Sequence, residues 1–215
     1  MPASRIVVLI SGSGSNLQAI IDACLSNQIS GDVVSVISNK ADAFGLTRAK
    51  NAGIETCVLS HKDFASREDY DAQLAKLIDS FDPALVVLAG FMRILTPSLV
   101  QKFKGKMLNI HPSLLPKYQG LNTHQRAIDA KDDVHGVSVH FVTEELDGGP
   151  VVLQAKVPIL ANDTAESLAQ RVHEQEHIIY PLAVQWFSEQ RLTMEADYAV
   201  FDNQPLPPQG AQFAE

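Results

Sequence analysis

Short apolar runs alternate with longer amphipathic stretches through the first half of the chain. The runs are rich in β-branched residues and hold few polar positions, which is typical of strands buried on both faces. These predicted strands span residues 6–10, 33–37, 54–59 and 85–88. Between them the pattern predicts helices over residues 17–23 and 64–81, and a loop followed by a helix over residues 39–52. Such alternation predicts βαβ units and therefore an α/β fold with a doubly wound, mostly parallel sheet.

The second half of the chain predicts a different edge for this sheet. Residues 135–142 alternate strictly between apolar and polar, a Gly-rich bend follows at 146–150, and 151–157 is again apolar. This pattern predicts a strand pair, antiparallel at the sheet edge. Asp163-Thr164-Ala165-Glu166 resembles a capping box, and it precedes a long helix with an apolar face over 168–186.

We expect a single domain over residues 1–215, because the chain shows neither a linker nor a repeat. Its last stretch, 197–215, contains Pro205, Pro207 and Pro208 and is predicted to be a partly ordered tail.

Composition narrows the classes of function. The formal net charge of −8 disfavours a broad surface for nucleic acid and leaves small molecules as the expected partners. No apolar run reaches about 18 residues, so no membrane segment is predicted. The two cysteines, Cys24 and Cys57, form no C-x-x-C pair and are expected to be buried thiols in a reducing compartment. A cytoplasmic location is therefore expected.

A Gly-rich turn, Ser11-Gly12-Ser13-Gly14-Ser15-Asn16, connects the first predicted strand to a helix. Free backbone N–H groups at a helix N-terminus favour a bound phosphate. The dinucleotide fingerprint fails because Leu17 stands where its third glycine belongs, and no Walker lysine follows. Two interpretations stay open, a phosphate site and a merely tight turn.

The stretch Asn109-Ile110-His111-Pro112 ends a predicted strand, because proline has no N–H for the ladder. Side chains at i and i+2 share a face, which brings the Asn109 carboxamide beside the His111 imidazole. Together they offer two hydrogen-bond donors, or they simply cap the strand. Asp147 at the following bend has the same two interpretations, a chemical role or a turn cap, since a carboxylate often caps its own turn.

His173-Glu174-Gln175-Glu176-His177 matches the H-E-x-x-H pattern of zinc hydrolases. The chain contains seven histidines and many glutamates, so the match can arise by chance. A metal site here would also leave the Asn109–His111 strand end unexplained. We therefore predict a polar helix face and no metal.

Three separated blocks resemble the folate-dependent formyltransferase family: Asn109 to Pro116 with Gly120, His135 to His140, and Leu146 to Pro150. The stretches 10–18, 38–43 and 89–95 are similar to the members that act on phosphoribosylglycinamide. The resemblance covers nearly the whole chain and is weakest in the tail. Members that act on methionyl-tRNA carry an additional C-terminal domain, for which the residues after 195 are too few.

The resemblance implies transfer of a formyl group from 10-formyltetrahydrofolate to the amine of phosphoribosylglycinamide, a step of purine synthesis. It implies no metal and no tightly bound cofactor, with the folate as co-substrate, and a monomer or weak homodimer. The catalytic residues it implies are Asn109, His111 and Asp147. Those implied for the ribonucleotide and its phosphate are Gly12, Ser13, Gly14, Ser15, Asn16 and Glu176. Those implied for folate are Arg67, Met92, Arg93, Ile94, Leu95, Asn109, Thr143, Glu144, Glu145, Leu146 and Asp147.

These residue types suit a reaction that passes through a tetrahedral intermediate. Amine attack on a formyl carbon creates an oxyanion, which the Asn109 amide and a protonated His111 would stabilise, while Asp147 would hold the imidazolium and assist proton transfer. Two alternatives remain. A binding or regulatory protein would have kept the fold and lost the activity, although the presence of all three residues argues against it. A formyltransferase with another acceptor, such as a nucleotide sugar, is the second.

Overall fold

The computed structural model describes residues 3–214. Its main sheet has eight strands in the order β11-β7-β6-β5-β4-β1-β2-β3. The strands of this sheet are β1 (Ser4–Ile10), β2 (Gly31–Ser38), β3 (Glu55–Val58), β4 (Leu85–Leu88), β5 (Met107–His111), β6 (Val134–Phe141), β7 (Val151–Pro158) and β11 (Ala211–Phe213). The helices are α1 (Ser15–Leu25), α2 (Phe44–Asn51), α3 (Arg67–Asp79), α4 (Pro97–Lys102), α5 (Thr123–Asp129) and α6 (Ala165–Ser188), with a short 3₁₀ helix at His61–Asp63.

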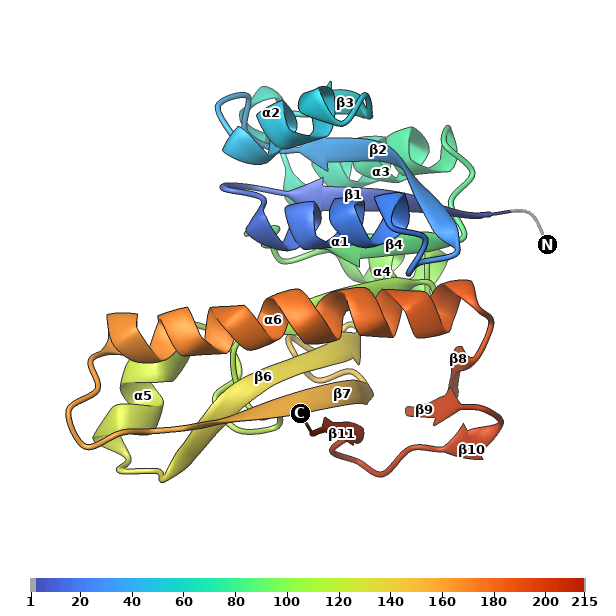
Figure 1. Cartoon of the computed structure of the whole chain (residues 1–215). Coiled ribbons are helices and arrows are strands. Elements are labelled where there is room, and N and C mark those ends of the chain that lie inside the picture. Colours follow the sequence, from blue (N-terminus) through green and yellow to red (C-terminus); the bar gives the residue numbers. More distant parts are fainter. Residues whose placement is uncertain (1–2, 215) are drawn as a thin grey trace.

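Helices cover both faces of this sheet, which confirms the predicted α/β class (Figure 1). Alternate residues of β1 belong to opposite cores, because successive side chains of a strand point to opposite faces. Ile6 and Val8 pack in the core that α1, α2 and α6 cover, whereas Val7 and Leu9 pack in the core under α3 and α4. The continuous apolar run in the sequence reflects this burial on both sides.

The carboxyl ends of β1, β4 and β5 lie side by side, because these strands are parallel neighbours. The loops that follow them also contact one another. Ser11 N–H donates to the Gly90 carbonyl (3.1 Å), and the Ser11 hydroxyl accepts from Met92 N–H (2.9 Å). Ligands of doubly wound sheets gather at this end of the strands.

The expected antiparallel strand pair is present, with β6 antiparallel to both β5 and β7. The pairing places His140 opposite Asn109 and Ser138 opposite His111. One feature differs from the pattern-based prediction. The strand at this edge is β11, which pairs with β7 in parallel.

Helix starts also differ in detail from the sequence prediction. The helix expected from residue 64 begins at Arg67, because the Ser66 side chain accepts a hydrogen bond from Asp69 N–H and caps it there. In α6 the capping box is formed by Thr164 and Ser167 in place of Asp163 and Glu166. A hydroxyl at the third helical position serves the same purpose as the expected carboxylate.

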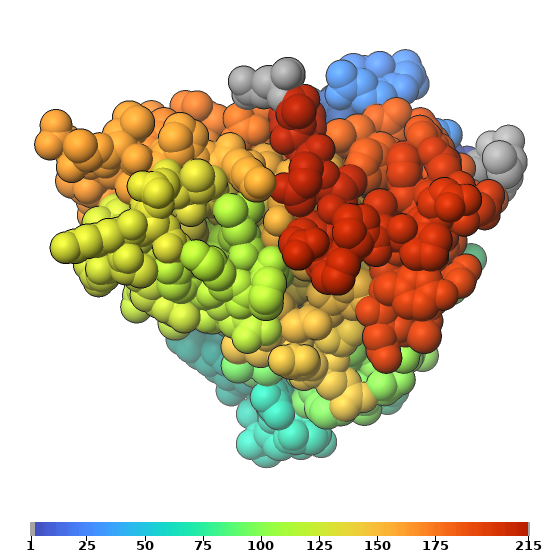
Figure 2. All heavy atoms as spheres, turned by 90° about the horizontal axis from the view of Figure 1, so that it is seen from below, coloured from blue at the N-terminus to red at the C-terminus, as the bar shows by residue number. Residues whose placement is uncertain are grey.

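Residues after α6 carry more regular structure than the proline-rich sequence indicates. Strands β8 (Leu192–Glu195), β9 (Tyr198–Phe201) and β10 (Gln204–Pro205) form a small antiparallel sheet. The chain then returns to the main sheet through β11, and Figure 2 shows this red C-terminal segment on the molecular surface. Among residues 3–214, no helix combines the length and apolarity needed to span a membrane.

Candidate active site

Asn109 and His140 form a fixed pair across β5 and β6. The buried His140 Nδ1 lies 2.9 Å from the Phe141 carbonyl, which only accepts, so this nitrogen carries the proton. His140 Nε2 is therefore an acceptor, and Asn109 Nδ2 donates to it at 3.2 Å. Burial lowers the pKa of His140 to about 4. A neutral His140 thus orients the Asn109 carboxamide, whose second N–H is not used in this bond.

His111 lies between two oxygen acceptors. Its Nε2 donates to the Tyr118 carbonyl at 2.8 Å, and its Nδ1 lies 3.4 Å from Asp147 Oδ2. Only 7% of the His111 side chain and 8% of the Asp147 side chain are exposed. Each ring nitrogen of His111 therefore faces an oxygen that accepts hydrogen bonds.

The Asp147 carboxylate reaches across to a different loop. Its backbone has a φ of 50°, in the left-handed region that Asp and Asn tolerate. Its Oδ2 accepts from Gly120 N–H at 3.0 Å, and its Oδ1 lies 3.8 Å from His140 Nε2. Asp147 therefore connects the β6–β7 bend to the loop after β5 and to both histidines.

The Gly-rich turn leaves the start of α1 open. Gly14 has a φ of 70°, no side chain caps the helix, and its first turn holds no acidic residue. A side chain at Gly14 would meet the Gly45 backbone at 2.5 Å, whereas one at the exposed Gly12 would meet nothing within 4 Å. Arg48 fixes the turn by donating from Nε to the Ser13 carbonyl (2.8 Å). Uncapped N–H groups beside a cation suit an anionic ligand.

A polar network joins this turn to α6. Glu176 Oε2 accepts from Asn16 Nδ2 and from His173 Nδ1, both at 2.8 Å. His173 Nε2 lies 2.8 Å from the Ser15 hydroxyl. Asn16 is 9% exposed, and its Oδ1 has no partner among the described residues. The network leaves a buried acceptor at the turn, where a ligand donor would satisfy it.

The H-E-x-x-H stretch has the helical spacing that was expected but not a metal geometry. The rings of His173 and His177 meet edge-on, with centroids 4.3 Å apart and an angle of 60° between their planes, and Glu174 is exposed. Both ring nitrogens of His173 already have partners. Within residues 3–214 no group of three or more His, Cys, Asp and Glu side chains has an arrangement that could hold a metal ion.

Apart from Asn109 on β5, the residues that the resemblance implies for folate lie on the loops after β4 and β6 and at the start of α3. Met92, Ile94 and Leu146 are large apolar side chains with 67%, 57% and 51% exposure, while Leu95 is buried. Arg93 lies over the Tyr70 ring at 4.8 Å, and the half-exposed Arg67 is 4.0 Å from Glu68.

The acidic bend between β6 and β7 completes this set. Glu144 is exposed and accepts from Gln101, Glu145 is exposed, and Thr143 is half-buried. The bend therefore carries the exposed Leu146 next to Asp147, and residues 143–150 include no lysine or arginine.

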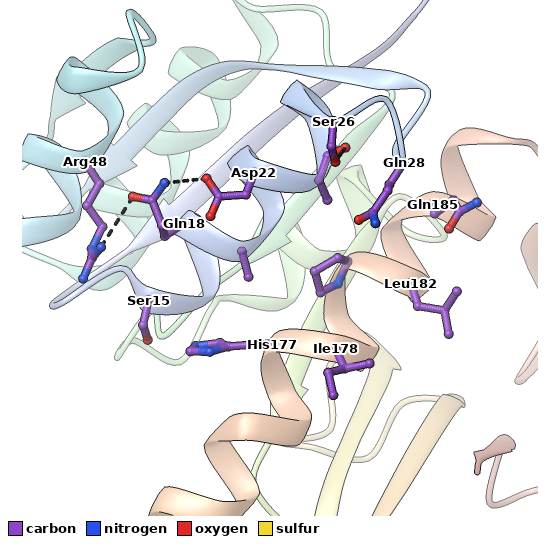
Figure 3. Close-up of a pocket in the computed structure, with 13 residues that line it drawn as sticks. Ser15, Gln18, Asp22, Ser26, Gln28, Arg48, His177, Ile178, Leu182 and Gln185 are labelled. Carbon is purple, nitrogen blue, oxygen red and sulfur yellow. Dashed lines mark hydrogen bonds between the residues drawn. The ribbon is translucent and has the colours of Figure 1, made fainter. Parts of the chain in front are cut away.

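A groove of about 830 Å³ lies between α1 and α6. Ser15, Arg48 and His177 line one end of it, and Leu182 and Gln185 line the other (Figure 3). Arg48 and Asp22 both bond Gln18 there. Asn109, His111 and Asp147 do not line this groove. The groove thus touches the Gly-rich turn and is separate from the polar cluster at the end of β5.

Sequence reasoning missed His140, Tyr118, Arg48 and the role of His173. The strand register pairs His140 with Asn109, and an assumed antiparallel pairing of 107–111 with 135–142 could have found it. Tyr118 contributes a backbone carbonyl, which no side-chain pattern reveals. Arg48 reaches the turn from another helix, and only the tertiary structure places it there.

The chain is similar in sequence and structure to known formyltransferases. A sequence model described as "Formyl transferase" matches residues 4–184. The chain is 60% identical to phosphoribosylglycinamide formyltransferase of Escherichia coli, over 96% of this chain and 97% of that protein. It is 54% identical to the protein of the same name from Haemophilus influenzae, with the same coverage. The structure of phosphoribosylglycinamide formyltransferase from Coxiella burnetii has a TM-score of 0.95 at 50% identity and covers 99% of this chain and 100% of that chain.

Proposed function

The chain belongs to the formyl transferase family, and from this membership and the site geometry we propose that it moves the formyl group of 10-formyltetrahydrofolate to the amine of phosphoribosylglycinamide, in purine synthesis. The observation that carries the proposal is the cluster of Asn109, His111 and Asp147 at the end of β5. The open Gly-rich turn supports a phosphorylated acceptor, because it offers uncapped N–H groups.

In the proposed reaction the acceptor amine attacks the formyl carbon directly and forms a tetrahedral oxyanion. The free N–H of the Asn109 carboxamide donates to this oxygen. Since His140 holds the other N–H at 3.2 Å, the amide is oriented before substrate arrives. Such preorganised donors stabilise charge that develops only in the transition state.

His111 is the second donor to the oxyanion in this proposal. Its Nε2 is engaged with the Tyr118 carbonyl and its Nδ1 faces Asp147. Donation to the oxyanion therefore requires the Tyr118 bond to open, which assigns a movement to the loop that carries Tyr118. Asp147 holds the imidazolium and assists the proton as it passes from the attacking amine to the folate nitrogen.

The two substrates occupy neighbouring regions in this scheme. The turn from Gly12 to Asn16 takes the ribonucleotide phosphate, and Glu176 contacts the glycinamide part. The exposed apolar residues Met92, Ile94 and Leu146, together with the rest of the folate set named from the sequence, cover the folate. The reaction uses folate as a co-substrate, with no tightly bound cofactor and no metal. We also propose that the protein is cytoplasmic and that it is a monomer or a weak homodimer.

The direct experiment mixes purified protein with phosphoribosylglycinamide and a 10-formyl folate, and follows the folate absorbance as the formyl group leaves. Transfer to this amine, and not to a nucleotide sugar amine, supports the assignment. Absence of transfer by folded protein would support the binding-protein alternative. Preference for the sugar amine would support the other acceptor class.

A further inference from the structure

His173 lies where a proton can change the hydrogen-bonding role of the phosphate turn. Its Nδ1 faces the Glu176 carboxylate at 2.8 Å, which only accepts, so Nδ1 carries a proton in either charge state. Its Nε2 faces the Ser15 hydroxyl at 2.8 Å. A hydroxyl can donate or accept, and the state of Nε2 decides which.

The two charge states present different groups to a ligand. With a neutral ring, the Ser15 O–H donates to Nε2, and the outward lone pairs of Ser15 repel an anion. With a protonated ring, Nε2–H donates to Ser15, and the hydroxyl proton is released toward the turn. Protonation therefore adds a positive charge and a hydroxyl donor at the same place, beside the uncapped start of α1.

We propose that His173 is a proton-dependent specificity residue of the ribonucleotide site, which selects a phosphorylated ligand by turning Ser15 into a phosphate donor when the imidazole is protonated. This inference rests on the proposed function for the location of the phosphate. It concerns binding, and it assigns no step of the formyl transfer to His173.

The charged surroundings favour the protonated ring. The hydrogen bond to the Glu176 carboxylate raises the pKa of His173, and 44% of the His173 side chain is exposed, so a ligand can reach it. The other charged or titratable groups that interact with the network are His177 and Tyr180 on α6, Arg48 on α2 and His124 on α5. Burial lowers the pKa of His177, which leaves it neutral beside His173. A bound dianionic phosphate would raise the pKa of His173 further.

The test measures that pKa directly by NMR. The imidazole Hε1 signal of His173, assigned by its loss in His173→Gln, is titrated in the full-length protein alone, with ribose 5-phosphate and with ribose. We expect ribose 5-phosphate to raise the pKa by about one unit, equivalent to about tenfold tighter binding below that pKa, and ribose to leave it unchanged. This probe lacks an amine, so its phosphate, with a second pKa of about 6, is its only group that titrates near neutral pH, and a titration of the probe alone accounts for it.

Three variants sharpen the result. In His173→Gln the dissociation constant for ribose 5-phosphate should lose most of its dependence on pH above about 6.5, the ordinary pKa of an imidazole. Ser15→Ala should weaken binding severalfold while the pKa still rises, because the charge remains without the hydroxyl. His61→Gln, on the 3₁₀ helix, is the matched histidine control and should keep the pH dependence of the unchanged protein.

Separate outcomes identify which claim fails. An unmoved pKa while ribose 5-phosphate perturbs the amide signals of the turn would overturn the role of His173, as would failure of this probe to bind. If the formyl-transfer assay succeeds on the same sample, the proposed function survives either result. If the pKa rises but no formyl transfer occurs, the phosphate role stands and the proposed function is wrong.

Discussion

At the scale of single residues, the carboxylate of Asp147 carries the clearest prediction. Asn should keep the φ of 50° and the hydrogen bond from Gly120 N–H, since an amide oxygen also accepts. It removes the negative charge beside His111. We expect Asp147→Asn to fold normally and to lose about 10²–10⁴-fold in kcat, the usual range for acid–base assistance. Thermal midpoint, ribonucleotide Kd and kcat are measured together, and near-native turnover would reduce Asp147 to a structural residue.

Two glycines of the first turn form a matched pair. A methyl group at Gly12 meets nothing within 4 Å, so it would disturb a ligand of the turn and not the fold. A methyl group at Gly14 collides with the Gly45 backbone at 2.5 Å and also requires a φ of 70°.

Gly12→Ala should therefore raise the KM for the ribonucleotide at least about tenfold, with little change in the folate KM or in the thermal midpoint. Gly14→Ala should mainly lower the thermal midpoint. Equal effects of Gly12→Ala on the two KM values would remove the phosphate from this turn.

At the scale of elements, the contact between α5 and β6 predicts acid sensitivity. His135 Nε2 lies 3.2 Å from His124 Nδ1, and burial followed by this neighbour lowers the pKa of His135 to about 4. In the unfolded chain the pKa of a histidine is about 6.5. Between the folded and the unfolded pKa of His135, the unfolded state thus binds more protons than the folded state. The contribution of His135 to the free energy of unfolding is therefore fully present above about pH 6.5 and is lost as the pH falls toward 4.

Denaturant unfolding measured across this range checks the prediction. Each such histidine contributes a slope of at most about 1.4 kcal/mol per pH unit. His140, whose pKa burial also lowers, adds to the slope in the same direction. His135→Gln should remove one part of it. An unchanged slope in that variant would show that another group causes the acid sensitivity.

Elements were predictable where local chemistry decides them, and the site was predictable where it follows a strand end. The apolar run of β1 and the glycines after it determine a strand, a turn and a helix without help from the rest of the chain. The link between Asn16 and Glu176 joins residues 160 positions apart, and the pairing of His140 with Asn109 depends on strand register. Such contacts depend on packing, which no local pattern encodes.

At the scale of the whole molecule, β11 ties the C-terminal residues to the sheet. It pairs with β7 through Ala211, Gln212 and Phe213, so a chain that stops after Pro208 exposes the edge of β7. We expect this truncation to lower the thermal midpoint by several degrees, at about 2–4 °C per kcal/mol for a chain of this length. Unfolding should remain a single transition, which would support the single domain predicted from the sequence, and kcat should stay unchanged.

Glycine substitutions supply the control for that truncation. Gly210 and Gly53 both have positive φ, but a methyl group at Gly210 would lie 2.7 Å from the Val152 backbone, while one at Gly53 meets nothing within 4 Å. Gly210→Ala should therefore approach the loss seen on truncation, and Gly53→Ala should cost only about 1–2 kcal/mol of backbone strain. Equal losses would mean that the docking of β11 adds little stability.

The central claim is that the cluster at the end of β5 transfers a formyl group to the amine of phosphoribosylglycinamide. The most direct measurement is the rate of folate absorbance change with 10-formyltetrahydrofolate and this acceptor, for the unchanged protein and for Asp147→Asn. The account predicts rapid transfer that saturates with the ribonucleotide and falls about 10²–10⁴-fold in the variant. Absence of transfer by folded protein, or equal rates in the two proteins, would contradict it.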